Sequence, residues 1–317
     1  MSKDFDILVV GELNADLILR GEVAPVFGQV EKLIDEAALT IGSSSAICAC
    51  GLARLGLRVA FVGKMGDDEF GRFMVRELSA RGIDTGGVVV DAGVKTGLSV
   101  ILSRGADRAI LTYSGSIGAL RYSDIDPALV SRARHLHLGS YFLLDSLRPD
   151  TPKLFHLASR QGVTVSMDTN YDPSEHWDGG VQEALRGASI FLPNEKELCA
   201  IARQPTVESA LATMDKKQIV AVKLGARGAV ARFGDTQAQA DSVSVEVVDT
   251  TGAGDTFDAG FIYGFLAKWD LARILRFACV CGSLSTRAAG GTAAQPNLPE
   301  ALEWMPISNL QSPISNL

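Results

Sequence analysis

The chain of 317 residues is long enough to bury a large core, because 47% of its residues are hydrophobic. Its formal net charge is −7 and its pI about 5.2, and its basic residues are scattered. This argues against nucleic acid or an anionic membrane as a partner, since phosphate-rich surfaces need a concentrated basic patch. The start of the chain lacks the pattern of a signal peptide, and no apolar stretch approaches the roughly 18 residues of a membrane span. We therefore expect a soluble, cytoplasmic protein.

Short apolar runs alternate with segments of helical periodicity along the chain. The expected strands are residues 5–10, 60–63, 98–102, 109–113, 135–138, 163–167, 189–192, 219–223, 229–233 and 243–248. The expected helices include residues 67–81, ended by Gly82, as well as 152–161, 181–186 and 257–266. Strands that alternate with helices predict an α/β fold, with a mainly parallel central sheet and helices on both faces.

Two regions, residues 15–41 and 87–113, read as extended segments without a good helix. They predict a small β-sheet lid over one end of the α/β body. Because no Pro-, Gly- or Ser-rich linker separates them, we expect the lid to be inserted in a single domain spanning residues 1–317. Residues 306–317 contain the direct repeat PISNL and are expected to form a loose tail.

The five cysteines are an odd number, which favours reduced thiols over a disulfide framework. Four of them form two Cys-x-Cys pairs, Cys48 with Cys50 and Cys279 with Cys281, in segments that look helical. Residues two apart on a helix point to different sides, so we expect these thiols to pack in the core and not to bind metal.

The most informative segment is the glycine-rich turn DTTGAGDTFDAG, residues 249–260, which precedes an apolar helix. Its small residues let the backbone approach a ligand closely, and the start of a helix presents free N–H groups and a partial positive charge. This is a pocket for phosphate oxygens. Asp255 at its mouth is equally suited to capping the helix and to accepting a proton during phosphoryl transfer. No P-loop motif and no dinucleotide-binding GxGxxG is present, which argues against a nicotinamide dehydrogenase.

The same segment resembles the C-terminal signature of the PfkB, or ribokinase-like, carbohydrate kinases at nearly every position, and the resemblance extends from Gly11 to about Pro296. The resemblance implies a ribokinase-like fold and an ATP-dependent sugar kinase that uses Mg²⁺. It also implies that Asp255 is the catalytic base and that the backbone amides of Gly252, Ala253, Gly254 and Asp255 form an anion hole.

Two segments of the N-terminal half resemble the sugar-binding positions of that family. Asn14 and Asp16 are expected to bind sugar hydroxyls, although an Asx turn after a strand would also explain them. Gly42 and Ser43 begin a segment where the family usually has Gly-Gly and, four residues later, a sugar-binding asparagine. Here Ser43 replaces the second glycine and Ile47 the asparagine, so a serine at 43–45 either substitutes for the lost contact or caps the helix.

The C-terminal half carries the family's nucleotide and metal positions. Asn194 and Glu197 resemble a pair near Mg²⁺ and the ATP phosphates, with a capping pair as the alternative. Lys223, Gly225 and Gly228 resemble a loop that lines the nucleotide, often Thr-x-Gly-x-x-Gly in the family. Lys223 is a variation there, which either reaches a phosphate or solvates the loop, and the adenine is expected against residues 279–283. A monovalent-cation site, with K⁺ as the candidate ion, is expected at Asp249 and Thr251 together with carbonyls near residues 288–291.

A third departure from the family concerns the segment Asp168-Thr-Asn-Tyr-Asp172, where the family usually ends with arginine. The missing positive charge disfavours a phosphorylated or acidic sugar, although Arg104 and Arg108 on the lid side are alternative sources of charge. The acceptor is therefore a small sugar or sugar-like polyol. A nucleoside kinase of the same fold and a sugar-binding regulatory protein without turnover remain open, as does a homodimer that pairs through the lid.

Overall fold

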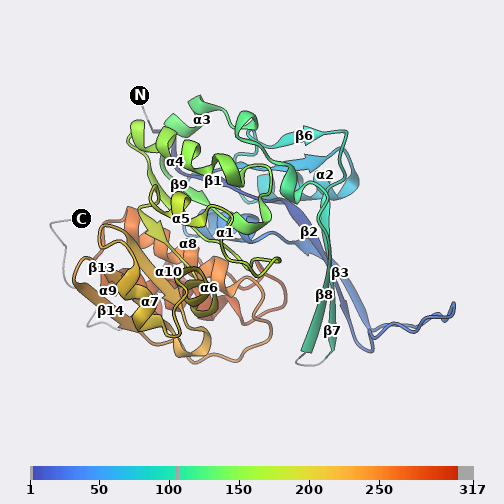
Figure 1. The fold of residues 1–317 in the computed structure, drawn as a ribbon. Helices are drawn as coiled ribbons and strands as arrows, with labels where there is room; N and C mark the ends of the chain where they lie inside the picture. Colours follow the sequence, from blue (N-terminus) through green and yellow to red (C-terminus); the bar gives the residue numbers. More distant parts are fainter. Residues whose placement is uncertain (1–2, 105–106, 306–317) are drawn as a thin grey trace.

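The computed structural model describes residues 3–104 and 107–305 and contains one large sheet, one smaller sheet and a two-stranded ribbon (Figure 1). In spatial order, the strands of the large sheet are β14 (Thr236–Ala240), β13 (Ala229–Phe233), β12 (Ile219–Lys223), β11 (Ile190–Phe191), β10 (Thr164–Met167), β9 (Ala133–Leu138), β1 (Phe5–Val10) and β4 (Val59–Val62). Neighbouring strands from β4 to β12 are parallel, and only β13 and β14 add an antiparallel edge. The predicted, mainly parallel sheet is confirmed.

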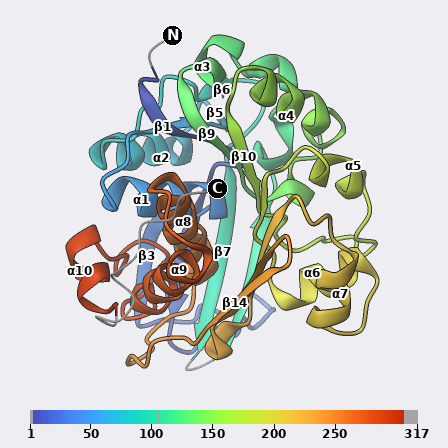
Figure 2. The same cartoon turned by 90° about the vertical axis from the view of Figure 1, so that its left-hand side faces the viewer.

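Helices cover both faces of this sheet, as Figure 2 shows. One face carries α1 (Ser44–Arg54), α2 (Glu69–Ala80), α8 (Ala253–Leu266) and α9 (Leu271–Ser285), with α10 (Leu298–Glu303) packed on α9. The other carries α3 (Pro127–Ser131), α4 (Thr151–Arg160), α5 (Val181–Leu185), α6 (Glu195–Ala202) and α7 (Val207–Thr213). Single 3₁₀ turns lie at η1 (Ile117–Ala119), η2 (Tyr122–Asp124), η3 (Tyr141–Leu143), η4 (Arg148–Asp150) and η5 (Gly225–Arg227).

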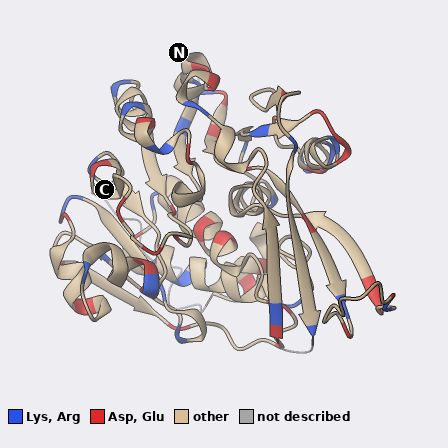
Figure 3. Ribbon diagram, turned by 45° about the vertical axis from the view of Figure 1, so that its right-hand side comes forward, with Lys and Arg blue, Asp and Glu red and all other residues tan. Residues whose placement is uncertain are grey.

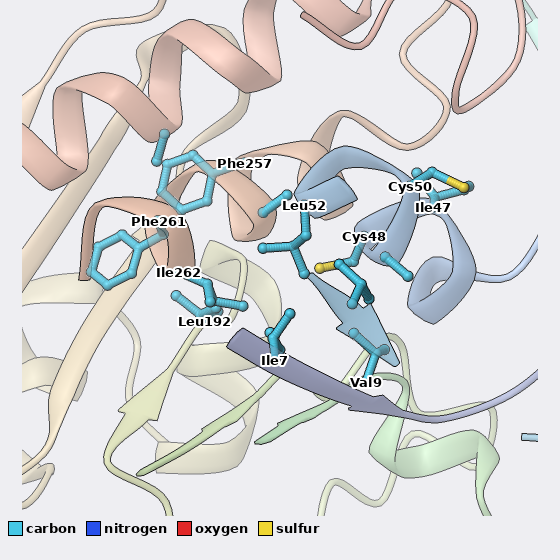
Figure 4. Packing of buried hydrophobic residues seen from close by; sticks show 14 of the residues in the cluster. Ile7, Val9, Ile47, Cys48, Cys50, Leu52, Leu192, Phe257, Phe261 and Ile262 are labelled. Atoms are coloured by element: carbon cyan, nitrogen blue, oxygen red, sulfur yellow. The ribbon is translucent and has the colours of Figure 1, made fainter. Parts of the chain in front are cut away.

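Strand β1 contributes to the core on both faces of the sheet. Ile7 and Val9 point to the face covered by α1 and α8, and Leu8 and Val10 point to the opposite face. Figure 4 shows Ile7 and Val9 beneath side chains of α1 and α8. Such continuous apolar runs are typical of parallel strands covered on both sides.

The cysteines behave as the sequence predicts. Cys48 and Cys50 lie on α1, and Cys279 and Cys281 lie on α9; all four are buried, Cys199 is partly buried, and all five are free thiols. No group of His, Cys, Asp or Glu within residues 3–104 and 107–305 has an arrangement that could hold a metal ion by itself. The four thiols of the two Cys-x-Cys pairs pack among buried apolar side chains.

The smaller sheet is the expected β-sheet beside the α/β body. It consists of β3 (Glu36–Ile41), β2 (Asn14–Arg20), β7 (Gly97–Arg104) and β8 (Asp107–Tyr113), in that order, and extends away from the body at the right of Figure 1. Residues 87–96 do not belong to it. Instead β6 (Val89–Asp91) pairs with β5 (Lys64–Gly66) in the separate ribbon.

Two further sequence predictions need correction. The edge strand β14, whose alternating Thr, Gln and Ala residues carry little apolar signal, was not predicted. Residues 243–248 were expected to form a strand, but they are irregular. The amide of Val243 donates to the Ser283 hydroxyl and that of Val248 to the Thr286 carbonyl, so this segment follows α9 and does not extend the sheet. The expected tail at 306–317 lies outside the described residues.

Basic and acidic residues are interspersed along the described chain, as expected from the scattered basic residues of the sequence (Figure 3). Among the described residues, no helix combines the length and the apolar character that crossing a membrane requires.

Candidate active site

The glycine-rich turn forms the start of α8, as predicted. Gly252 has φ of +72°, and a side chain there would place its Cβ 2.8 Å from the Cα of Gly291. Both the left-handed backbone and the close approach therefore require glycine. In the first turn, Ala253 N–H donates to the Thr250 carbonyl and Thr256 N–H to that of Gly252. The amides of Gly254 and Asp255 have no protein acceptor in the described part of the chain, so they are available to an anion.

Asp255 lies in this first turn and is partly buried. The pKa of its carboxyl is raised well above the usual value, mainly by burial and further by the negative charges of Asp168 and Glu12. The charge of Lys223 and a hydrogen bond from Ser44 act in the opposite direction and lower this pKa. A carboxyl group with a raised pKa is a better proton acceptor once it is ionised.

Beside Asp255 lies a buried charge cluster that the sequence analysis did not foresee. The Lys223 ammonium, at the end of β12, forms ion pairs with Asp168 after β10 and with Asp258 on α8, the latter at 3.1 Å. Burial alone would lower the pKa of Lys223, but the two carboxylates outweigh it and raise that pKa well above normal. A Cβ added to Gly254 would lie 3.7 Å from Nζ of Lys223, so the cluster directly underlies the expected anion hole.

A cavity of about 430 Å³ opens between the start of α8 and α9. It brings together the predicted nucleotide segments, with Gly225 and Gly228 on one side, Ala253 and Gly254 on another, and Cys279, Gly282 and Ser283 of α9 opposite. Residues 242–247 close its outer side. Lys223 also lines the cavity, but its ammonium is bound to Asp168 and Asp258 and does not point freely into the cavity.

Asn194 and Glu197 form a reciprocal capping box at the start of α6. The Asn194 amide donates to one carboxylate oxygen of Glu197 at 2.8 Å, and the Glu197 amide donates to the Asn194 side chain at 2.9 Å. This is the capping alternative that the sequence left open. Burial and the charge of Asp168 raise the pKa of Glu197 to about 7, so its negative charge is incompletely compensated.

The segments around β2 and the loop before α1 form a second group of polar residues. Asn14 and Asp16 begin β2, both are buried, and the Asn14 amide donates to Asp16 Oδ1 at 3.2 Å. A Cβ at Gly42 would lie 2.1 Å from the same oxygen, which explains the glycine. Burial raises the pKa of Asp16 to about 7, with a hydrogen bond from Ser99 lowering it and the charge of Glu12 raising it further. The charge of Glu12 also raises the pKa of Asp255.

The serines at the start of α1 have different roles. Ser43 is the N-cap: its hydroxyl accepts from the Ala46 amide and donates to the Glu12 carbonyl at 2.6 Å, and its φ of +67° explains why the family has glycine there. The structure therefore favours capping over the predicted sugar contact for Ser43. Ser44 instead lies beside the site, because it accepts from Asn170 at 3.3 Å and hydrogen-bonds to Asp255.

Ile47 fills the space of the missing asparagine with an apolar side chain. Its methyl groups lie against Gly252 and Gly291, so close that a Cβ on Gly291 would come within 2.4 Å. The buried Gln295 side chain fastens this region by donating to the Ile47 carbonyl and to the Thr256 hydroxyl. Neither Glu12 nor Gln295 belongs to a motif that the sequence analysis used, and both became apparent only from their burial and contacts.

Asp172, which replaces the family's arginine, is a structural residue. It is buried and accepts hydrogen bonds from Ser174 and from the Trp177 amide. Those donors stabilise its ionised form and lower its pKa, although burial opposes them. It organises the loop after Asn170 and leaves no positive charge at this position.

Asp249 and Thr251, the expected cation ligands, lie side by side before the anion hole. One Asp249 oxygen accepts from the amide and hydroxyl of Thr251, and the other accepts from the Gly290 amide. Arg108 of β8 donates to the Thr251 hydroxyl at 2.7 Å. The region predicted around residues 288–291 is thus brought next to Asp249.

The fold and these converging segments define a kinase of the ribokinase type, and sequence comparison identifies the family. The sequence profile described as pfkB family carbohydrate kinase matches residues 4–298. The chain therefore belongs to the pfkB family of carbohydrate kinases, which are phosphotransferases with an alcohol group as acceptor.

Two relatives illustrate the range of the family. An ATP-dependent ribose-1-phosphate kinase of Halopiger xanaduensis is 33% identical, over 91% of this chain and 94% of its own length. Fructokinase-1 of Oryza sativa is 29% identical, over 83% of this chain and 88% of its own length. The prediction of a sugar kinase is thus confirmed at the level of the family.

Solved structures confirm the fold. Ribokinase of Arabidopsis thaliana, complexed with ribose and ATP, has a TM-score of 0.81 and 25% identity, covering 96% of this chain and 98% of its own. An Escherichia coli protein described as a ribokinase II, in complex with ATP and Mg²⁺, has a TM-score of 0.83 and 24% identity, with the same coverage.

Proposed function

We propose that this carbohydrate kinase transfers the γ-phosphate of ATP to a hydroxyl of a small, neutral sugar or polyol, with Asp255 as the base. One observation carries the proposal: a partly buried carboxyl with a raised pKa lies in the same helical turn as two backbone amides without protein acceptors. Phosphoryl transfer needs both a proton acceptor for the attacking hydroxyl and donors for the charge that develops on the phosphoryl oxygens.

The cavity between α8 and α9 is the proposed ATP site. Its walls are small or apolar residues and backbone, including Ala253 and Gly282, and it opens onto the start of α8. A planar adenine fits such a surface, and phosphates directed at the helix start would meet its free amides. The ATP complexes of the Arabidopsis and Escherichia coli proteins support this assignment.

Mg²⁺ is the proposed cofactor, and Glu197 is the candidate residue beside it. Glu197 is a single carboxylate, and the described residues hold no cluster of His, Cys, Asp or Glu that could bind a metal ion without ATP. An incompletely compensated, buried carboxylate would nevertheless be stabilised by a nearby cation, and Mg²⁺ commonly keeps water ligands between itself and the protein. Bound with ATP, the ion would offset negative charge on the phosphate oxygens.

Asp16 and Asn14 are proposed to orient the acceptor from the opposite side. Asp16 retains acceptor capacity beyond its bonds from Asn14 and Ser99, and its buried position favours a partner that brings hydroxyl donors. Ser44, which hydrogen-bonds to Asp255, and its partner Asn170 are further candidates. Asp172 and Ile47 add no positive charge, which supports a neutral acceptor. The comparisons favour a sugar over the nucleoside and regulatory alternatives.

A screen for ADP release over neutral sugars, sugar phosphates, keto-sugar acids and nucleosides tests the assignment. We expect turnover with a neutral sugar or polyol and little with nucleosides. ATP hydrolysis or phosphoryl transfer confined to nucleosides, or to acceptors that are already phosphorylated, would contradict the proposed acceptor class.

We further propose that two copies associate through the small sheet. Strand β8 is exposed along its whole length, and its Leu111 is 63% exposed beside Ile110 and Tyr113. A second copy presents the same apolar strip, so a two-fold pairing would cover both. Light scattering should give twice the 33.6 kDa of the chain, and Leu111→Lys should halve it; a monomeric wild type would contradict this proposal.

A cytoplasmic location is also proposed, supported by the five free cysteines, since reducing compartments preserve thiols. Fractionation of cells that express the native gene, with immunodetection of the chain, tests it; recovery of the protein outside the cytoplasm would contradict the proposal.

A further inference from the structure

One contact joins the outer strand of the small sheet to the loop that leads into the anion hole. Arg108, in β8, places its guanidinium 2.7 Å from Oγ1 of Thr251 and 3.5 Å from Oδ1 of Asp249, residues 143 and 141 positions away in sequence. The same sheet also comes close to Gly290, because an added Cβ there would lie 3.8 Å from Thr40 of β3. The small sheet therefore reaches the nucleotide side of the site through Arg108 and also carries Asp16.

The Asp249 carboxylate is already surrounded by donors. Its Oδ1 accepts from the Thr251 amide at 2.9 Å and from the Thr251 hydroxyl at 2.7 Å, with Arg108 beside them, and its Oδ2 accepts from the Gly290 amide at 2.9 Å. Both oxygens of this carboxylate are therefore hydrogen-bonded within the protein, and the Arg108 guanidinium lies beside them.

These contacts do not fit the monovalent cation that the sequence suggested at Asp249 and Thr251. A bound K⁺ needs several oxygen ligands that are free to turn toward it, and a cation at this carboxylate would face the positive guanidinium at close range. Arg is always protonated, and its planar group of donors binds oxygen acceptors with a defined geometry. Arg108 therefore supplies from the small sheet the charge that a cation would otherwise supply from solvent.

We propose that Arg108 is a positioning residue that fastens the small sheet to the loop at 249–251 and takes the place of a monovalent cation there. Only the expected effect of Arg108 on kcat rests on the proposed kinase function. By holding Asp249 and Thr251, Arg108 orders the segment that continues into Gly252 and so positions the amides of the anion hole. It acts through that loop and does not itself touch the reacting atoms.

The test compares wild type with Arg108→Gln, which keeps donors but removes the charge, in KCl and in choline chloride at equal ionic strength. Arg20→Ala is the matched control, because Arg20 lies on β2 of the same small sheet and forms an exposed ion pair with Glu36. We expect equal kcat of wild type and Arg20→Ala in both salts. Arg108→Gln should lose about tenfold in kcat in choline chloride, the loss expected for a charge-assisted hydrogen bond, and regain it in KCl.

A readout without turnover accompanies the kinetics. The unfolding temperature of wild type should be the same in the two salts, whereas that of Arg108→Gln should rise specifically in KCl. A wild type that needs K⁺ or is stabilised by it would overturn the inference. So would an Arg108→Gln variant that matches wild type in choline chloride, or one whose loss KCl does not restore. Absence of kinase activity in every wild-type assay would contradict the proposed function instead, and the unfolding measurement would still decide the inference.

Discussion

The cavity between α8 and α9 is lined mainly by small and apolar residues, whereas the acceptor side carries the buried carboxyl groups of Glu12 and Asp16 and the partly buried one of Asp255. A surface of backbone and small side chains recognises a ligand by shape and by amide donors, and it tolerates few changes. Buried carboxyl groups select a ligand by its hydroxyl pattern and are sensitive to single substitutions. The acceptor side departs from the family pattern at Ser43, Ile47 and Asp172, and the nucleotide side departs from it at Lys223.

The cluster of Lys223, Asp168 and Asp258 lies between these regions, and its loss should have the largest effect on stability. Lys223→Met leaves the buried Asp168 and Asp258 without their cationic partner, and removing one member of a buried ion pair typically costs about 3–5 kcal/mol. Urea unfolding at neutral pH measures the loss. Because protonation of the orphaned carboxyl groups relieves it, the loss should shrink as the pH falls.

Lys216→Met is the matched control, since Lys216 forms an exposed ion pair with Asp235. We expect its unfolding to match wild type. If Lys223→Met unfolds like this control, the cluster does not stabilise the junction between the two regions.

On the nucleotide side, Gly252→Ala should reduce kcat by about a hundredfold, because the new Cβ conflicts with Gly291 and with the left-handed backbone and displaces anion-hole amides. Gly82→Ala is the control, because Gly82 has a similar φ of +76° but an added Cβ there would meet nothing within 4 Å. Steady-state kinetics with the identified acceptor compares the two. Equal kcat values of the two variants would mean that the geometry of the turn at Gly252 is not what sustains catalysis.

On the acceptor side, Asp16→Asn should lower kcat/KM for the sugar by about tenfold to a hundredfold, because an amide cannot accept two hydroxyl donors as a carboxylate does. The KM for ATP should stay unchanged, since the nucleotide cavity is separate. A parallel rise in the KM for ATP would show that the two regions are not independent.

A smaller effect concerns the pH dependence of the ligand-free protein. The folded-state pKa of Asp16 is raised to about 7, so its contribution to stability is present below its ordinary pKa and is lost as the pH rises through about 7. The unfolding temperature should therefore fall as the pH rises from about 4 to about 7 and then level off, and it should fall less steeply in Asp16→Asn. Glu197, with a pKa of about 7, contributes in the same direction, so part of the slope should remain. Identical slopes for both proteins would exclude a raised pKa at Asp16.

The sequence predicted the sheet because its strands are continuous apolar runs, and it predicted Gly252 and Asp255 because they stand in one long, contiguous motif. It did not predict β14, whose alternating polar residues resemble a loop, nor the irregular path of residues 243–248, whose backbone partners lie on α9. Lys223, Asp168 and Asp258 come from three separate elements, and only the fold brings their charges together. The same holds for Arg108, whose partners lie more than a hundred residues away.

The most direct test of the central claim is the turnover of Asp255→Asn with the identified acceptor, measured together with its affinity for ATP. Loss of the base should reduce kcat by at least about a thousandfold, while ATP binding, measured calorimetrically, should be nearly unchanged. Unfolding in parallel should show a variant at least as stable as wild type at neutral pH, because the raised pKa means that the ionised Asp255 destabilises the fold. Near-normal turnover in Asp255→Asn would contradict the assignment of Asp255 as the base.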